Sequence, residues 1–452
     1  MSKKGFSLSP YIEKIFETSG EHAEWGGYYN YDFLSADGTK LLCNRSPFDG
    51  RKIEKGDTVE VGYYDIPTGE WHCLDKSDSF NWPQATMLQW IPNTNNKEVV
   101  FNLSKDNHLI SRIINIETGE KRDLCYPIYC VTPDGKKAIT LNLERSYWTP
   151  AYHYQSVANE ACNVDVLEGD GIFALDLKEN TLERIISLED VIKLKPEEAF
   201  SQGKHWLEHI MINPSGTEIV FLHRYNLPNT GRLTRMVMAN IDGSNMHVID
   251  GWSKYTWSHF GWKSDDSFVI YSRSSRRKSF NANVNVKQAN DKNVIDNVNT
   301  SLKVKVKSAI RVLIKNVFEL LPTRIKVSIR YISGYQMYVK TDNKYKFTKF
   351  YQGRHLDVDG HPSFEKNGKY MITDTYADYG KTRKLVVLNS VNDKRILLGE
   401  FYSPLWETPA SCDLHPKLSR DGQFLVIDTA YSGIHRMMVF ELRWDKIIKK
   451  LS

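Results

Sequence analysis

The chain has 452 residues, of which 41% are hydrophobic and 25% charged, a composition typical of globular proteins. It excludes a disordered chain, a collagen-like fibre and a small disulfide scaffold. The 60 basic and 55 acidic residues leave a net charge of +5, so the composition does not indicate a nucleic-acid partner. Aromatic residues make up 12%, with 24 Tyr and 11 Trp, which favours an all-β protein or a sugar-binding surface.

The first twenty residues include basic residues but contain no apolar run of signal-peptide length. No stretch of about 18 uncharged apolar residues occurs that could span a membrane. The six cysteines have irregular spacings without a CxxC pair, so we expect free thiols and a cytoplasmic protein.

One phrase recurs along the chain: a tight turn containing Asp-Gly, Asn-Gly or Ser-Gly, followed by an alternating apolar run. Its five clear copies are SADGTKLLCNRS from Ser35, TPDGKKAITLNL from Thr132, NPSGTEIVFLHR from Asn213, EKNGKYMITDTY from Glu365 and SRDGQFLVIDTA from Ser419. Two weaker copies are IPNTNNKEVVFNLS from Ile91 and KSDDSFVIYSRS from Lys263. Each copy predicts a β-hairpin, since the turn residue supplies a positive φ and the next residues alternate between two faces.

A second strand–turn–strand phrase follows most copies, as in YYDIPTGEWHCL from Tyr63, IINIETGEKRDL from Ile113 and YVKTDNKYKF from Tyr338. In the last unit we assign it, without a clear turn, to MVFELRWDKIIKKL from Met438. Seven units of about four strands fit the chain at about 65 residues each, which predicts an all-β, seven-bladed β-propeller. Two stacked β-sandwiches are the alternative, but unrelated sandwiches would not repeat one turn phrase.

Two long gaps between turn positions locate insertions in a single propeller spanning residues 1–452. The gap from 135 to 216 contains SLEDVIKLKPEEAF, which predicts a short helix. The gap from 266 to 368 predicts an insertion at 275–335, between the repeats of blades five and six. It holds an Asn-rich loop, 281–300, and an amphipathic helix, 301–321, within a stretch of eight Lys/Arg and one Glu. This helix either contacts an anionic membrane surface peripherally, at the inner face, or packs on the propeller or a second subunit.

Four histidines share one position, seven residues before the turn of their repeat. They are His209, His259, His361 and His415. The first strand of each propeller blade lines the central channel, so we expect these imidazoles to converge. Two residues earlier the same count reaches Asp413, which shares a strand face with His415. Imidazoles and a carboxylate on a rigid scaffold suit Mn²⁺, Fe²⁺, Zn²⁺ or Ni²⁺. Core histidines bonded to backbone are the alternative.

Arginines show a weaker register. Arg235, Arg383 and Arg436 open equivalent strands in blades four, six and seven, and Arg224 ends the second strand of blade four. Guanidinium groups near a funnel bind carboxylates in a bidentate manner, whereas solvated strand ends are the other interpretation.

The phrases HPSFEKNGKYMITDTYAD and DLHPKLSRDGQFLVIDTAYSG, with the histidine register between them, resemble the oligogalacturonate lyase family of seven-bladed propeller polysaccharide lyases. The resemblance covers roughly His205 to the C-terminus apart from the insertion. It implies β-elimination on a uronic-acid oligosaccharide or polysaccharide, with a divalent metal, typically Mn²⁺, in the funnel. The family usually has an H-x-H pair in the last blade, where this sequence has Asp413-x-His415.

By position, the resemblance implies that His361, Asp413 and His415 bind the metal. It also implies that Arg235 and His259, 24 residues apart, are catalytic, with Arg235 or a neutral histidine as base and His259 as acid. His209, Arg224, Arg383 and Arg436 would then contact the substrate. Two other functions stay open: a propeller that binds a glycan or protein without catalysis, and a glycan-active enzyme of another class such as a glycosidase.

Overall fold

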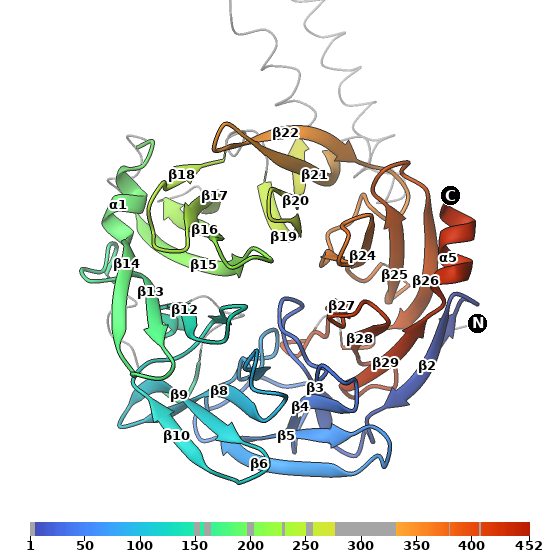
Figure 1. The fold of residues 1–452 in the computed structure, drawn as a ribbon, viewed down its shortest axis with the longest axis horizontal. Helices are drawn as coiled ribbons and strands as arrows, with labels where there is room; N and C mark the ends of the chain where they lie inside the picture. Colours follow the sequence, from blue (N-terminus) through green and yellow to red (C-terminus); the bar gives the residue numbers. More distant parts are fainter. Residues whose placement is uncertain are drawn as a thin grey trace, which may run out of the picture.

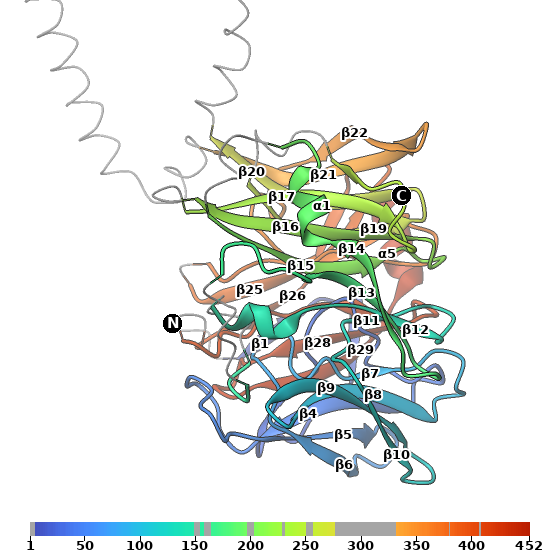
Figure 2. The ribbon, with the colours of Figure 1, turned by 90° about the vertical axis from the view of Figure 1, so that its left-hand side faces the viewer.

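The computed structural model describes residues 5–148, 154–157, 164–196, 203–227, 231–249, 256–275, 331–378, 380–405 and 408–452. Seven antiparallel sheets stand around a central axis, which confirms the predicted seven-bladed propeller (Figure 1). Seen edge-on, the strands cross the thickness of the disc between two faces of connecting loops (Figure 2). Each sheet packs between two neighbours, so its central strands are buried on both faces, as in the fully buried β24 (Tyr370–Asp374).

In each blade the first strand lies nearest the axis and the last lies at the rim. Blade one comprises β3 (Ala23–Trp25), β4 (Lys40–Ser46), β5 (Val59–Asp65) and β6 (Trp71–Ser77). Blade two comprises β7 (Gln89–Trp90), β8 (Glu98–Lys105), β9 (His108–Asn115) and β10 (Lys121–Leu124). Blade three comprises β11 (Cys130–Val131), β12 (Lys137–Leu141), β13 (Gly171–Asp176) and β14 (Leu182–Ser187). Blades four and five comprise β15 (Lys204–Ile212), β16 (Glu218–Leu227), β17 (Gly231–Asn240) and β18 (His247–Val248); and β19 (Thr256–Ser264), β20 (Ser267–Ser275), β21 (Tyr331–Thr341) and β22 (Lys344–Tyr351). Blade six comprises β23 (Ser363–Phe364), β24, β25 (Thr382–Asn389) and β26 (Arg395–Tyr402), and blade seven contains β27 (Lys417–Leu418), β28 (Phe424–Thr429) and β29 (Arg436–Leu442).

The recurring turn phrase forms the hairpin between the first and second strand of each blade. Its glycines have positive φ, for example +72° at Gly135 and +66° at Gly368. These turns also contact the preceding blade: a Cβ at Gly135 would lie 2.2 Å from the Pro92 carbonyl oxygen, and one at Gly368 would lie 2.6 Å from that of Lys263. Glycine is therefore required both by the turn and by the packing of adjacent blades.

The ring closes with a strand from the start of the chain. β2 (Ile12–Glu17) pairs with β29 as the outer strand of blade seven, and β1 (Phe6–Leu8) adds a fifth strand to blade six. The prediction that a second strand follows Met438 in this blade is therefore wrong. Residues Trp444–Leu451 form helix α5 instead, with Ile447 and Leu451 buried at a spacing of one helical turn.

The residues predicted as an insertion separate the second and third strands of blade five, because β20 and β21 pair from Ser267↔Val339 to Ser275↔Tyr331. They therefore lie within blade five rather than between blades five and six, and residues 276–330, including the predicted helix 301–321, lie outside the described residues. The short helix predicted before blade four is α1 (Leu188–Lys193), with Ser187 as its N-cap. A short 3₁₀ helix, Leu143–Trp148, follows β12. Among the described residues no helix has the length and apolarity to cross a membrane, and the five described cysteines are free thiols.

Polar side chains at the ends of second strands hold the innermost segments in place. Asp374 on β24 accepts the backbone N–H groups of His361 at 2.7 Å and Leu414 at 3.1 Å, joining blade six to blade seven. Asp428 on β28 accepts those of Gly26 at 2.9 Å and Gly27 at 3.2 Å, joining blade seven to blade one. In blade two, Asn102 both donates to and accepts from the backbone of Ile128.

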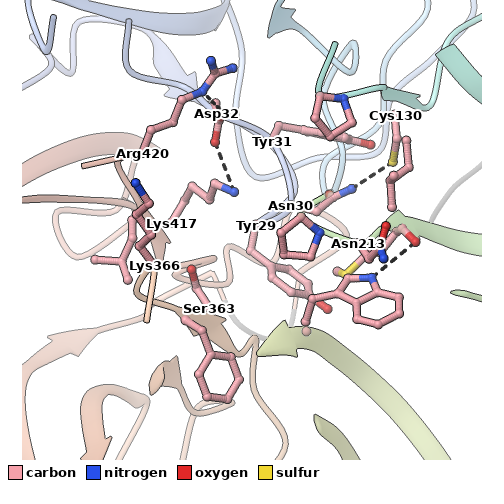
Figure 3. Close-up of a pocket in the computed structure, with 18 of the residues that line it drawn as sticks. Tyr29, Asn30, Tyr31, Asp32, Cys130, Asn213, Ser363, Lys366, Lys417 and Arg420 are labelled. Atoms are coloured by element: carbon pink, nitrogen blue, oxygen red, sulfur yellow. Dashed lines mark hydrogen bonds and ion pairs between the residues drawn. The ribbon is translucent and has the colours of Figure 1, made fainter. Parts of the chain in front are cut away.

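A second link closes the ring on the hairpin side. The Asp32 carboxylate in blade one accepts a hydrogen bond from Arg420 Nε at 2.8 Å and lies 3.2 Å from Lys417 Nζ, both in blade seven (Figure 3). Burial opposes ionisation of Asp32, but these two cations hold its pKa below the ordinary value.

We expect deletion of residues 1–18 to lower the melting temperature by roughly 5–10 °C, because β29 loses its partner strand and Ile12 its buried site. Differential scanning calorimetry measures the shift, and deletion of residues 1–4, which precede β1, is the matched control. If both truncations melt within about a degree of each other, closure by β2 does not stabilise the ring.

Replacing Asp32 by Asn should destabilise the protein at neutral pH by about 0.5–1 kcal/mol, the range for partly exposed ion pairs. Because folding lowers the pKa of Asp32, its contribution is present above about pH 4 and disappears as the pH falls through the folded value. The difference in melting temperature between wild type and Asp32→Asn should therefore shrink from pH 7 toward pH 3, and also in 1 M salt. Glu183→Gln, an exposed change on β14, is the control; a pH-independent difference would contradict the assignment.

Candidate functional site

The four histidines of the common register meet at the axis. The ring centroids of His259 and His361 are 4.2 Å apart, those of His361 and His415 are 4.3 Å apart, and those of His209 and His259 are 6.3 Å apart. All four rings are buried, with exposed fractions of 1–7%. The convergence expected from counting back from the turns is therefore present.

The backbone at these positions departs from regular strand geometry. The pairing of β15 with β16 shifts register between Glu208 and Met211, around His209, and that of β19 with β20 shifts between Trp257 and Phe260, around His259. His209 and His415 have φ values of +55° and +44°, in the left-handed region. Such bulges and left-handed residues redirect side chains and concentrate at functional sites, which explains why these rings turn toward the axis.

Three of the side chains form a candidate metal centre. One ligand atom from each of His361, Asp413 and His415 lies within 4.8 Å of the other two. The carboxylate of Asp374 lies 2.9 Å from His361 Nδ1 and accepts a hydrogen bond from it. With Nδ1 protonated, Nε2 of His361 carries the free lone pair, the arrangement found in metal-ligating histidines.

The three candidate ligands differ in their electrostatic surroundings. Burial and the neighbouring His361 ring lower the pKa of His415 to about 3, so its imidazole is neutral at neutral pH, as metal binding requires. Burial opposes ionisation of Asp413, but Arg383 lowers the pKa of that carboxyl, which therefore stays ionised. Burial likewise disfavours the charged form of His361, yet the facing Asp374 carboxylate raises the pKa of the ring and has its own pKa lowered in turn.

Arg383 is buried and forms an ion pair with Asp413. Its Nε donates to Ser403 Oγ at 3.2 Å, and a terminal nitrogen donates to Ser411 Oγ at 3.1 Å. Of the four arginines predicted to contact substrate or reacting atoms, Arg383 is thus the one that directly contacts the candidate metal ligands.

The remaining histidines and two tyrosines complete the centre. His259 Nδ1 lies 3.1 Å from an Asp359 carboxylate oxygen. The ring of Tyr28 stacks on His209 at 5.2 Å between centroids and meets His415 edge-on at 5.2 Å. The ring centroid of Tyr29 lies 5.0 Å from that of His361, and its hydroxyl donates to the Phe260 carbonyl at 2.6 Å. Tyr29 therefore crosses the axis from blade one to blade five.

The other predicted arginines lie in different networks. Arg235 donates from Nε to His223 and from its terminal nitrogens to the carbonyls of Val191 and Leu194 at the end of α1. Its register partner on β16 is His223, which itself lies 2.9 Å from His205. These contacts tie Arg235 to α1 and to β16, and the predicted catalytic pairing of Arg235 with His259 stays a prediction.

Arg224 forms an ion pair with Glu208, whose carboxylate also lies 3.7 Å from His209 Nε2. Arg224 therefore lies one residue removed from the histidine cluster. Arg436 pairs with Glu17 of β2 at 3.3 Å, so its contacts belong to the closure of the ring. 

A cavity of about 650 Å³ lies along the axis and is lined by Tyr29, Asn30 and Tyr31 of blade one (Figure 3). The residues that line it follow the histidines on the innermost strands, for example Met211, Gly261, Ser363 and Lys417. The histidines stand two residues earlier on the same segments, so the candidate metal centre and this cavity lie at different depths along the axis.

Sequence reasoning missed Asp374, Asp428 and Tyr28. A signal for the two carboxylates was present, because MITDT and LVIDT place Asp six residues after the turn glycine in both blade six and blade seven. The sequence contained no such repeated signal for Tyr28. Its position depends on the preceding Gly26-Gly27 segment, whose backbone N–H groups donate to Asp428.

Comparisons with known proteins bear on the fold. No family model matches the sequence, and no curated protein matches it either. Among solved structures, an oligogalacturonate lyase in complex with manganese is similar to this chain at 14% identity and a TM-score of 0.56, over 98% of both chains. An oligogalacturonate lyase from Vibrio parahaemolyticus is similar at 13% identity and a TM-score of 0.56, over 97% of this chain and 96% of that one. The chain therefore has the propeller fold of these lyases along nearly its whole length.

Replacing Asp374 by Asn should weaken divalent-metal binding about 10- to 100-fold, because His361 loses the acceptor that fixes its ring and tautomer. Titration calorimetry with Mn²⁺ on chelator-treated protein measures this change. Asp378→Asn is the control, because Asp378 lies four residues further along the chain and pairs with Lys384 rather than with a histidine. Equal affinities of the two variants would exclude Asp374 as the residue that orients a ligand.

Proposed function

We propose that this protein is a metal-dependent polysaccharide lyase that cleaves a uronic-acid-containing oligosaccharide by β-elimination. The observation that carries the proposal is the triad of His361, Asp413 and His415 beside two further imidazoles at the axis. The shared fold with an oligogalacturonate lyase in complex with manganese supports this choice.

The donor set fits a divalent ion such as Mn²⁺. Two imidazoles and one carboxylate suit borderline and hard divalent metals, and the triad leaves coordination positions for substrate. When bound, the ion would neutralise the uronate carboxylate and so make the proton α to it more acidic. Arg383, paired with Asp413, adds positive charge on the same side of the site.

The two imidazoles outside the triad supply the proton transfers in this proposal. His209 and His259, 6.3 Å apart between ring centroids, flank the reacting bond. One takes the C5 proton, the electron pair forms the C4=C5 double bond, the C4–O4 bond breaks, and the other imidazole gives a proton to the leaving oxygen. Asp359 orients His259 for this exchange, as a carboxylate orients an imidazole in other acid–base sites.

Arg235 has a positioning role here rather than that of the base. Its guanidinium donates to His223 and to the α1 carbonyls, and an arginine in such contacts stays protonated. Its substitution should act through the position of α1 and the strands of blade four.

We expect the Mn²⁺-loaded protein to release a 4,5-unsaturated uronate, followed by its near-ultraviolet absorbance, from at least one polymer in a panel of polygalacturonate, alginate and glycosaminoglycans. His415→Ala should lose most of the metal and the activity together, because the triad loses a ligand. His259→Ala should keep the metal but lose at least 100-fold in turnover. His108→Ala, at an exposed position on β9, is the control.

Two outcomes would contradict the proposal. New reducing ends without the unsaturated product identify a hydrolase. Stoichiometric metal with no turnover on any acidic polymer favours a binding propeller.

A further inference from the structure

Tyr376 is an exposed aromatic residue beside the candidate metal centre. This residue is 38% exposed, whereas His259 and His361 are 7% and 1% exposed. Its ring centroid lies 5.9 Å from each of these two histidines. Tyr376 therefore covers the pair of imidazoles from the solvent side.

Exposure increases outward in one direction from the cluster. Tyr28 and Tyr29, on the inner side, are 2–3% exposed. The carboxylates of Asp359 and Asp413 are 16% and 21% exposed, and Tyr376 is more exposed still. Among the described residues around the cluster, Tyr376 is thus the most exposed of these side chains, and it lies in the β24–β25 connection, at the end of β24 opposite the inner hairpin.

The position of Tyr376 is fixed by the segments that orient the histidines. Its backbone N–H donates to the carbonyl of Asp359 at 2.9 Å, and the carboxylate of Asp359 faces His259. Two residues earlier in the chain, Asp374 holds His361. A change in the position of this ring would therefore be coupled to both imidazoles, so the ring is part of the site.

The chemical surroundings of the ring match an acidic pyranose. The guanidinium of Arg383 lies over the ring of Tyr376, 5.8 Å from its centroid, so an exposed aromatic ring and a cation occur together beside the histidines. A hexuronic acid presents an apolar C–H face, which packs on an aromatic ring, and a carboxylate, which pairs with a guanidinium or a metal ion. A small carboxylic acid offers only the second group.

We propose that Tyr376 is the stacking platform for the hexuronate unit that enters the site, and thereby selects acidic pyranoses over other carboxylates. This inference rests on the proposed function, because it assigns the substrate unit to the same centre. The aromatic ring makes the contact and the hydroxyl does not, so Phe should replace Tyr here.

The test separates binding from turnover. Tyr376→Ala, Tyr376→Phe and Tyr376→Leu are compared in the His259→Ala background, where binding is measured by titration calorimetry without cleavage. The probes are the trisaccharides of galacturonate, mannuronate and guluronate, with cellotriose as the neutral control. Phe347→Ala, which removes an exposed ring on β22, is the control variant.

We expect Tyr376→Ala and Tyr376→Leu to bind the recognised acidic trisaccharide roughly tenfold more weakly, because the stacked face is lost. Tyr376→Phe should bind within about threefold of the parent. Metal content and melting temperature should stay unchanged in all three, which a ring that only packs on the histidines would not allow.

Equal affinity of Tyr376→Ala and the parent overturns the inference, and so does parallel loss of metal or the absence of binding to any acidic trisaccharide. Failure of the proposed function has a different signature: the intact protein binds the acidic trisaccharide through Tyr376 and forms no unsaturated product.

Discussion

The inner edge of each innermost strand faces the axis, where no neighbouring strand supplies hydrogen-bond partners. Buried backbone N–H and C=O groups need such partners, and leaving them unpaired costs as much as losing a hydrogen bond. This protein satisfies the need with side chains from the second strands: Asp374 and Asp428 accept N–H groups of the next blade, and Asn102 pairs with Ile128. The rest of the centre depends on this device, because it fixes the segments that carry the histidines.

The same carboxylates shape the chemistry. Asp374 binds both the backbone and the ring of His361, so one group sets where the residue lies and which ring nitrogen is free. Asp428 accepts hydrogen bonds from the Gly26-Gly27 segment and so fixes the position of Tyr28 in the cluster. One of its carboxylate oxygens lies 4.0 Å from His415 Nδ1. Burial raises the pKa of Asp428 to about 7, a sign that its surroundings supply N–H donors but little positive charge.

The repeating part of this structure could be predicted from sequence, because each blade needs the same turn residue and the same alternation of apolar residues. A turn glycine recurs at each inner hairpin, so counting from it located the strands and brought the four histidines together. The closure of the ring could not be found this way: β2 pairs with β29 across 430 positions, from Ile12 to Leu442, and nothing local in IEKIFE identifies its partner. The helix α5 was missed for a related reason, since the repeat predicted a strand where Ile447 and Leu451 follow a helical period.

The part of the candidate site that could be predicted consists of residues at repeated positions in the blades. Residues whose place depends on contacts specific to one blade could not be predicted. The triad of His361, Asp413 and His415 follows from two positions in the repeat. The roles of the arginines do not, because they depend on which segment each guanidinium meets: α1 for Arg235, Glu208 for Arg224 and Glu17 for Arg436. Short irregular elements such as α1 occur in one blade and are not part of the repeat, so counting residues from the turn positions does not locate their contacts.

Asp413 distinguishes this centre from one built on a third imidazole. A carboxylate adds a negative charge to the ligand set and a preference for harder divalent ions, but its burial has an electrostatic cost. Arg383 offsets that cost through its ion pair with Asp413, and Ser403 and Ser411 in turn hold the guanidinium. Because Arg383 also lies over the ring of Tyr376, the carboxylate of Asp413 is accompanied by a cation next to this exposed aromatic residue. The guanidinium that stabilises the Asp413 carboxylate therefore also lies beside the position that we propose for an acidic sugar, which links this residue of the candidate metal centre to the proposed substrate.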